Sequence, residues 1–540
     1  MRLGPLYMSE FPFAAGEQAR EALPPEIDFL EGLPGVGLQT LEIAARKARM
    51  HGVGADEVLI AEGLIGEGDY YRALATRLAC PFVSRATALA PGFDYRVAMR
   101  ASVARTAADR EAFDWLLAPR GSEVADLLRM TDHGREGRIA RGRIAICAPG
   151  VFSALVRATA RAALAQDASF ALSRADASLS ANAPKVRWSN YIALGLSAAL
   201  LLGMATASPG VLQVAPMIMS VFFLGGIYVR LCASAASLVR SQPKPKPLSD
   251  FELPTYTILA PMYREAGVAA QFVAALKGLD YPPAKLEIKL VIEDDDRETA
   301  VALRRAGLAP NMEIVVAPAG MPRTKPRAMN VALPLARGEL LTIFDAEDRP
   351  ERDQLRVAAA AFAAAGPDVA CFQARLVIDN AHESVWAYFF AIGYAALFDA
   401  LNPGLALLGL PMPLGGTSNH FRTRLLRRVL GWDAWNVTED ADLGLRLARF
   451  GYQVGAIDSV TFEDAPLHFA PWLGQRARWM KGWMQTLAVF LGTFSLARTV
   501  GSSVGAGFGG KMGAFQASPP SARWSASSPG RCMARFTASA

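Results

Sequence analysis

Cysteine and histidine are scarce in this sequence, with five of each among 540 residues. The cysteines stand far apart, and no CxxC or Cys/His spacing of a metal site occurs. This pattern excludes a disulfide framework and predicts free thiols in a reducing cytoplasm. The cysteines are Cys80, Cys147, Cys232, Cys371 and Cys532.

A strong excess of one charge is also lacking, because 56 basic residues face 50 acidic ones and the net charge is +6. No basic stripe with interleaved aromatic residues occurs, so a nucleic acid polymer is not expected as a partner. The N-terminus has no charged start followed by an apolar run, and no signal peptide is expected.

Apolar residues, in contrast, make up 52% of the chain, which is above the usual share of a soluble protein. Two long apolar runs, Tyr191–Ala207 and Val211–Val229, each approach the ~20 residues that span a bilayer. Basic residues flank both outer ends, which places these ends on the cytoplasmic side. We therefore predict a transmembrane helical hairpin over residues 188–235, in contact with the lipid bilayer, in a multi-pass protein of the cytoplasmic (inner) membrane. Two buried core helices are the alternative.

The length predicts two or three domains. Residues 1–35 are rich in Pro and Gly and are expected to form a disordered tail. Residues 36–180 are expected to form a small α-rich domain, with helices over Ala55–Glu62 and Asp69–Leu78. An Ala- and Ser-rich stretch, 166–186, is typical of a linker.

The C-terminal residues 486–540 are mostly small and polar after about Leu496, with Gly, Ser, Ala, Pro and Arg dominant. We expect a poorly structured segment there. Two explanations stay open: a disordered tail, or a reading frame lost near Gln516 so that the true C-terminus is missing.

Between residues 250 and 485, short β-rich runs alternate with helical patterns. This alternation predicts an α/β domain with a parallel, doubly wound sheet. Ligands bind beyond the carboxyl ends of the strands in such sheets. The expected strands are Tyr256–Ala260, Leu286–Glu293, Glu313–Ala317, Leu340–Asp345 and Val369–Gln373.

Acidic clusters follow two of these strands, at Glu293–Asp296 and at Asp345–Asp348. Carboxylates at strand ends suit a hard divalent cation. Asp345 is aimed at the crevice, and Glu347 shares its orientation if the chain stays extended. Mg²⁺ or Mn²⁺ held there would neutralise a diphosphate leaving group. An acidic cap for the helix after Pro350 is the alternative.

Two further motifs lie at expected helix starts. Asp440, in Thr438–Asp440, is a candidate for the base that removes a proton from an acceptor hydroxyl; a capped helix is the alternative. Gln475, Arg478 and Trp479 share one helix face and could hold diphosphate and sugar rings. An amphipathic helix on the membrane surface is the alternative there.

Taken in order, these motifs resemble a membrane-embedded family 2 glycosyltransferase of the cellulose synthase and hyaluronan synthase type. The resemblance covers about residues 250–485. The motifs that carry it are Pro261–Glu265, Glu293–Asp296, Thr324–Asn330, Asp345–Glu347, Gly415–Phe421, Thr438–Asp440 and Gln475–Trp479.

The resemblance implies a GT-A (Rossmann-like) fold and inverting, processive transfer from a UDP-sugar to a polysaccharide acceptor. By motif, it implies donor binding by Tyr263, Glu265, Asp294, Asp295, Lys325, Asn330 and Asp345; a metal at Asp345 and Glu347; a catalytic base at Asp440; and acceptor or diphosphate contacts by Gly415, Gly416, Thr438, Glu439, Gln475, Arg478 and Trp479.

The chain departs from that family's pattern after residue 485, where the helices that form a polymer channel are not found. The N-terminal domain resembles that of type II secretion ATPases, some of which bind cyclic di-GMP, but its Met50–Gly54 segment lacks the start of the nucleotide-binding motif. A docking module for an export partner is the preferred expectation, with cyclic di-GMP binding second. Transfer of one sugar to a lipid carrier and an inactive membrane regulator are the functional alternatives.

Overall fold

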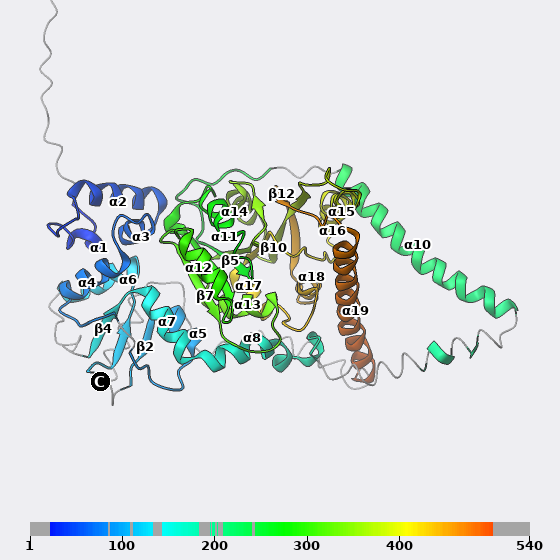
Figure 1. The fold of residues 1–540 in the computed structure, drawn as a ribbon, viewed down its shortest axis with the longest axis horizontal. Coiled ribbons are helices and arrows are strands. Elements are labelled where there is room, and N and C mark those ends of the chain that lie inside the picture. The colour runs from blue at the N-terminus through cyan, green and yellow to red at the C-terminus, as the bar shows by residue number, and fades with distance from the viewer. Residues whose placement is uncertain are drawn as a thin grey trace, which may run out of the picture.

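The structure is a computed structural model that describes residues 22–84, 87–107, 112–132, 143–182, 209–239 and 244–500, together with a few positions between 195 and 203. Three parts lie in a row in Figure 1: an N-terminal unit (residues 22–182), a central domain built on a large sheet, and two long helices at the far side.

The N-terminal unit contains the helices that the sequence predicts and a sheet that it does not. Its four short strands pair in the order β1-β4-β3-β2, with β2 antiparallel to β3 and the other pairs parallel. Strands of two to four residues are too short to show an alternating pattern. The elements are α1 (Pro25–Asp28), α2 (Leu38–His51), α3 (Ala55–Ala61), α4 (Glu67–Arg77), β1 (Phe82–Val83), α5 (Tyr95–Ala101), β2 (Val103–Arg105), β3 (Trp115–Leu117), α6 (Ser122–Asp132), β4 (Ile144–Cys147), α7 (Pro149–Thr159), α8 (Arg161–Ala175) and η1 (Ala177–Leu179).

Two boundary predictions for this region are wrong. Ile27 and Leu30 are fully buried, so the ordered unit begins inside the stretch expected to be a disordered tail. The stretch expected to be a linker contains the greater part of α8, whose Ala168 and Leu172 are also buried. Small side chains in α8 allow close packing against the central domain, a role that composition alone does not distinguish from a linker.

The central sheet has eight strands in the order β7-β6-β5-β8-β11-β10-β12-β9. All five predicted strands are present, and the α/β class is confirmed. The sheet is mixed rather than wholly parallel, because β11 runs antiparallel between β8 and β10 and β9 runs antiparallel to β12. The strands are β5 (Tyr256–Met262), β6 (Leu286–Glu293), β7 (Met312–Ala317), β8 (Leu340–Ile343), β9 (Arg349–Pro350), β10 (Val369–Ile378), β11 (Asn419–Arg422) and β12 (Gln453–Glu463).

Helices cover both faces of the parallel half of this sheet (Figure 1). Every residue of β5 is buried, as expected for a central strand with helices on both faces. The helices are α11 (Ala269–Lys277), α12 (Arg297–Arg305), α13 (Lys325–Ala332), α14 (Gln354–Ala364), α15 (Val385–Ala395), α16 (Asn402–Leu407), α17 (Thr423–Arg428), α18 (Glu439–Arg449) and α19 (Phe469–Val500), with the short 3-10 helices η2 (Pro283–Lys285) and η3 (Leu333–Leu335) and the π-helix η4 (Ala396–Leu401).

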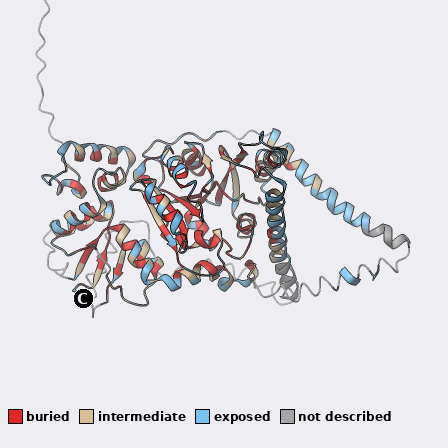
Figure 2. Ribbon diagram, in the orientation of Figure 1, coloured by how far each residue is buried: buried red, intermediate tan, exposed pale blue. Residues whose placement is uncertain are grey.

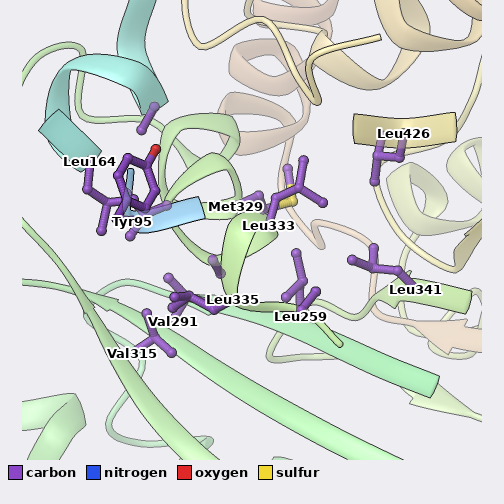
Figure 3. Packing of buried hydrophobic residues seen from close by; sticks show 14 of the residues in the cluster. Tyr95, Leu164, Leu259, Val291, Val315, Met329, Leu333, Leu335, Leu341 and Leu426 are labelled. Carbon is purple, nitrogen blue, oxygen red and sulfur yellow. The ribbon is translucent and has the colours of Figure 1, made fainter. Parts of the chain in front are cut away.

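One hydrophobic core joins the N-terminal unit to the central domain. Tyr95 and Leu164 of the N-terminal unit pack beside Met329 and Leu333 of the central domain, above the strands that carry Val291 and Val315 (Figure 3). Burial of this apolar surface stabilises the two parts as a single body. The N-terminal unit is therefore built onto the central domain.

Two helical stretches within the described residues are long and apolar enough to cross a membrane, Pro216–Val239 and Val385–Leu407. The first belongs to α10 (Pro209–Val239), which projects away from the body and is exposed over most of residues 216–231 (Figure 2). It corresponds to the second arm of the predicted hairpin, while most of the first arm lies outside the described residues. The stretch at 385–407 was not predicted, because its apolar run contains Asp399.

The base of α10 contacts α16 closely. A side chain at Gly404 would overlap the backbone of Ala233, so glycine is required for this approach. The two apolar stretches thus meet at one corner of the central domain. The helix α19 continues to Val500, so the expected loss of structure from residue 486 is wrong for 486–500; residues 501–540 lie outside the described part of the chain.

Asp56 is a buried carboxylate in the N-terminal unit, with 1% of its surface exposed. Its Oδ2 atom accepts a hydrogen bond of 2.8 Å from the Gly121 N–H, while Oδ1 has no partner among the described residues. Burial, followed by the neighbouring charge of Glu57, raises the pKa of Asp56 to about 7. The folded protein therefore holds a proton there that the unfolded chain releases at a lower pH.

Replacing Asp56 by Asn is expected to raise the Tm strongly at pH 8 and by clearly less at pH 5. The stability that a raised carboxyl pKa contributes is fully present below the ordinary pKa of 3.8 and is lost as the pH rises toward 7. The shift corresponds to a limit of about 4 kcal/mol at alkaline pH. Thermal unfolding in detergent at both pH values measures it, with the exposed Asp69→Asn as control; an equal gain at both values would contradict the assignment.

Candidate active site

Five elements from distant parts of the sequence bring polar side chains to one edge of the central sheet. The strands β5, β8 and β12 end there, and the helices α13 and α18 begin there. This is the edge at which open α/β sheets bind ligands. The side chains include Glu265 after β5, Lys325 at the start of α13, Asp345 after β8, Asp440 at the start of α18 and Glu463 at the end of β12.

These side chains together form the acidic group of the site, and Lys325 lies at its centre. Its Nζ atom lies 2.6 Å from a carboxylate oxygen of Asp345 and donates a 2.8 Å hydrogen bond to the Gly416 carbonyl. Gly416 also adjoins Asp440, because a Cβ atom at position 416 would lie 3.5 Å from Asp440 Oδ2. The structure thus brings together four of the residues that the motifs predict.

The negative charge of this group favours the binding of positively charged groups. Burial lowers the pKa of Lys325, but the charges of Asp345 and Glu439 outweigh burial and raise it. Burial and Asp440 raise the pKa of Glu439 to about 8. Burial also raises the pKa of Asp440, and Lys325 partly offsets the effect. Carboxylates crowded around one lysine are poised to accept protons or to bind cations.

Sequence reasoning missed Glu463. Burial, followed by the charges of Asp345 and Glu347, raises the pKa of Glu463 to about 8, so its carboxylate faces the predicted metal-binding pair. A signal was available: Glu463 ends a β-rich run, as Asp345 does. We did not predict that run as a strand, so the strand-end argument was not applied to it.

Two neighbouring acids have structural roles. Asp296 caps α12 through the Thr299 N–H and also accepts a hydrogen bond from the Arg264 N–H. Asp348 is buried, accepts a hydrogen bond from the Thr417 hydroxyl, and accepts another from the Asp345 N–H at 2.6 Å. Asp348 therefore fixes the loop that presents Asp345.

Asp294 and Asp295 lie at the outer side of the group, next to β6. Arg323 contacts Asp295 at 2.5 Å and Asp294 at 3.8 Å, and Arg161 of α8 lies 3.5 Å from Asp294. Tyr263 is 41% exposed beside them, with the Arg264 guanidinium 5.1 Å from its ring centre. These residues form a polar, open rim.

The predicted metal ligands fit a divalent cation in chemistry. No group of three or more His, Cys, Asp or Glu side chains within the described residues is arranged as a complete metal site. Mg²⁺ needs one or two protein carboxylates when substrate phosphates complete its shell, and Asp345 and Glu347 supply two. Burial and then Asp345 raise the pKa of Glu347, a repulsion that a cation would relieve. The buried Glu265 Oε2 adds an oxygen without a partner in the described residues.

The helix α19 connects to this group through Tyr394. The Tyr394 hydroxyl hydrogen-bonds the Glu463 carboxylate, and its ring stacks on Trp479 at 6.3 Å between ring centres. Gln475 has a buried Oε1 atom without a partner in the described residues, whereas Arg478 is exposed. Trp479 thus lies near the acidic group, but Arg478 does not contact it in this state.

The loop before Asp440 is fixed by α19. A Cβ atom at Gly482 would lie 2.4 Å from the Thr438 side chain, so this glycine permits the contact. The Asn436 amide donates to Thr486 Oγ1 at 2.9 Å, and the Val437 N–H donates to Gln485 Oε1 at 3.1 Å. Thr438 makes no side-chain cap hydrogen bond, so packing against α19 explains its position better than capping does.

The N-terminal unit holds the same loop from the other side. Ser180 Oγ donates to Asp433 Oδ1 at 2.9 Å, and the Trp435 indole N–H donates to the Ser169 carbonyl at 2.9 Å. Asn330, predicted to lie beside the donor, instead donates to the Ala168 carbonyl at 3.0 Å. Its other bonds go to the Trp432 backbone, so the structure does not bring the Asn330 side chain into the acidic group.

Gly415 lies at the edge of the group and is tightly enclosed. Its N–H donates to Gln373 Oε1 at 2.8 Å, and a Cβ atom there would lie 2.8 Å from the Phe398 ring. Gly415 therefore permits the close approach of β10 and η4 beside Lys325.

Comparison with known proteins gives the family of this region. Residues 340–514 match the family described as Glycosyl transferase family group 2. The chain is 24% identical over 249 residues to Probable glycosyltransferase YdaM of Bacillus subtilis (strain 168), covering 45% of this chain and 58% of the relative. It is 26% identical over 264 residues to Beta-monoglucosyldiacylglycerol synthase of Synechocystis sp., covering 47% and 54%. The chain thus spans about half the length of the curated relatives it matches.

One solved structure shows a weak similarity to this chain in both sequence and fold. Mannosyltransferase PcManGT from Pyrobaculum calidifontis, in complex with GDP-Man and Mn²⁺, shares 22% identity over 52% of this chain and 75% of that chain, with a TM-score of 0.41. This degree of likeness does not identify a donor or a metal for the present chain. The prediction of the enzyme family is confirmed by the sequence matches; the cellulose synthase and hyaluronan synthase type is not.

Proposed function

Because this chain carries a family 2 glycosyltransferase domain, we propose that it transfers sugars with inversion from a UDP-sugar to a polysaccharide acceptor at the cytoplasmic face of the membrane. The observation that carries the proposal is the convergence of Lys325, Asp345 and Asp440 around Gly416. These three residues lie on separate elements, and no structural need requires a lysine and two carboxylates to meet there.

In this proposal Asp440 is the base. Its carboxylate accepts the proton of the acceptor hydroxyl while the acceptor oxygen forms a bond to the anomeric carbon of the donor. The bond between that carbon and the diphosphate oxygen breaks, and UDP leaves with the electron pair. Attack from the face opposite to the leaving group inverts the anomeric configuration.

Lys325 stabilises the charge that develops on the leaving diphosphate. Its ammonium group is held by Asp345 and the Gly416 carbonyl before substrate binds, so little reorganisation is needed. Asp345 and Glu347 would hold Mg²⁺ or Mn²⁺, which would supply Lewis-acid neutralisation of the diphosphate. Asp294, Asp295 and Tyr263 form the rim at which we place the nucleoside.

The acceptor lies on the side of Trp479 in this proposal. Trp479 and Tyr394 present aromatic faces next to Glu463, a surface that suits stacking against sugar rings. A surface for several rings favours elongation of a polymer. The exposed apolar lengths of α10 and α15 support a position of this region beside a lipid bilayer.

A lipid acceptor is the second candidate. One relative, of which this chain covers about half the length, is named for the synthesis of monoglucosyldiacylglycerol, a glycolipid. The apolar stretches at 216–239 and 385–407 would bring a membrane acceptor to the same edge of the sheet. Under this alternative, Trp479 would contact one sugar ring rather than a chain.

The experiment is a donor panel with two readouts. Membranes containing the full chain are incubated with radiolabelled UDP-glucose, UDP-N-acetylglucosamine or GDP-mannose and Mn²⁺, and nucleotide release and product size are measured. A polymer ladder from a UDP-sugar supports the proposal, and a single labelled lipid supports the second candidate. Absence of nucleotide release with every donor would reject both and favour an inactive membrane regulator.

We place the N-terminal unit in a positioning and docking role, on the basis of its shared core with the central domain. An export partner and cyclic di-GMP have no support among the relatives and are not part of the proposed function. Location in the cytoplasmic membrane with several spans is also proposed, from the two apolar stretches and the glycolipid-synthesising relative.

A further inference from the structure

A cavity of about 120 Å³ lies between the N-terminal unit and the central domain. Its walls come from α5 and α8 on one side and from α13, η3 and α17 on the other. It is separate from the acidic group, and its lining is basic rather than acidic. Its polar lining includes Tyr95, Arg96, Arg100, Asp167, Asn330 and Arg427.

The acid in this lining is already neutralised. Asp167 receives a 2.7 Å contact from Arg96 and a second contact from Arg174, and it accepts a 2.9 Å hydrogen bond from the Tyr95 hydroxyl. Asp167 therefore cannot also balance the other two arginines of the cavity. The Asn330 side chain already donates hydrogen bonds to two backbone carbonyls.

Neither Arg427 nor Arg100 forms an ion pair with a described residue. Arg427 Nη2 donates to the carbonyls of Leu333, at 3.0 Å, and Ala336, while its buried Nε has no partner in the described parts of the chain. Arg100 is exposed at the mouth and forms no ion pair with a described residue. Burial and then the nearby positive charge of Arg100 lower the pKa of Arg427 to about 10, while Glu287, already paired with Lys289 and Arg337, acts in the opposite direction.

We propose that this cavity binds an oxyanion of phosphate size, held between Arg427 at the floor and Arg100 at the mouth. The volume accommodates several water-sized groups but not a whole nucleotide. Guanidinium groups bind phosphate oxygens with paired, charge-assisted hydrogen bonds. The oxyanion is either free phosphate or the phosphate end of a larger molecule that remains mostly outside.

The position of the cavity gives the binding a structural consequence. Arg100 belongs to α5 of the N-terminal unit and Arg427 to α17 of the central domain. An oxyanion between them replaces a repulsion across the interface by two attractions, so it fastens the N-terminal unit to the catalytic part. Binding to the folded form alone raises the Tm by mass action.

The test is phosphate-dependent thermal stability of the full chain in detergent, with EDTA present and the ionic strength held constant by chloride. We expect the Tm to rise with inorganic phosphate and to reach a plateau. Arg100→Ala is expected to weaken the apparent affinity about tenfold or more, whereas Arg100→Lys retains most of it. Arg304→Ala, an exposed arginine on α12, serves as the matched control and should behave as wild type.

A parallel titration with UDP separates the two sources. An Arg100-dependent rise at lower concentrations of UDP than of phosphate identifies the nucleotide's phosphate end; no such rise identifies free phosphate. The proposal is overturned if phosphate gives no rise beyond that of chloride, or if Arg100→Ala and Arg304→Ala respond alike. If phosphate bound at the acidic group instead, Arg100→Ala and Arg304→Ala would respond alike, so the experiment distinguishes the two sites.

Discussion

Replacement of Asp440 by Asn is expected to reduce sugar transfer by about 10³-fold while donor binding stays within about twofold of wild type. Asparagine keeps the shape of the side chain and its bond with the Ala441 N–H, but it cannot accept a proton. The neighbouring Glu439 is a poor replacement, because burial, the largest cause of its raised pKa, persists in the variant and favours its protonated form, although the effect of the Asp440 charge is lost.

The measurement is nucleotide release with saturating donor and acceptor, together with equilibrium binding of the donor. Asp458→Asn is a matched control, because Asp458 is an exposed aspartate on β12 outside the acidic group. Turnover of Asp440→Asn close to that of wild type would reject Asp440 as the base. The pH profile gives a second readout: wild-type activity falls as the pH drops through the raised pKa of Asp440, and the variant lacks this limb.

Replacement of Lys325 by Met is expected to reduce kcat/KM by about 10² to 10³-fold, mainly through weaker stabilisation of the leaving diphosphate. Methionine fills a similar volume without a charge. Loss of the lysine ammonium group removes the 2.6 Å contact with Asp345 and leaves the surrounding carboxylates without a cation between them. Since Lys325 lowers the pKa of both Glu439 and Asp440, the acid limb of the activity profile is also expected to move to higher pH.

The matched control is Lys277→Met, at an exposed lysine at the end of α11. A full pH profile of kcat/KM and donor affinity for both variants separates the charge effect from misfolding. If Lys325→Met retained its donor affinity and kcat/KM, the lysine would have a structural role only, and the carboxylate group would need another source of positive charge.

The parallel strands were predictable because they are short and rich in apolar and β-branched residues, as buried parallel strands are. Each is followed by a polar loop, and this break in pattern located Asp345 and the acids after β6. The strand β11 was not predictable in the same way. It spans four residues, and its place between β8 and β10 is decided by pairing with partners far away in the chain.

Within the site, the motif order identified Lys325, Asp345 and Asp440 but not how they meet. The sequence grouped Asp348 with Asp345 as a possible ligand, whereas burial against Thr417 makes it a support for the loop. It grouped Asn330 with Lys325, although a position five residues further along the helix faces a different neighbour. Side-chain direction follows from the helix only after its orientation in the fold is known.

The sequence by itself determined the α/β character of residues 250–485, the identity of the main acids and lysine, and the presence of long apolar stretches. Each of these depends on local composition, periodicity or motif, which do not require a folded partner. The tertiary structure alone decided that Glu463 joins the acidic group, that α8 and α19 hold the loop before Asp440, and that Arg100 and Arg427 share a cavity. These are contacts between segments far apart in the chain, and packing and burial, rather than local preference, select them.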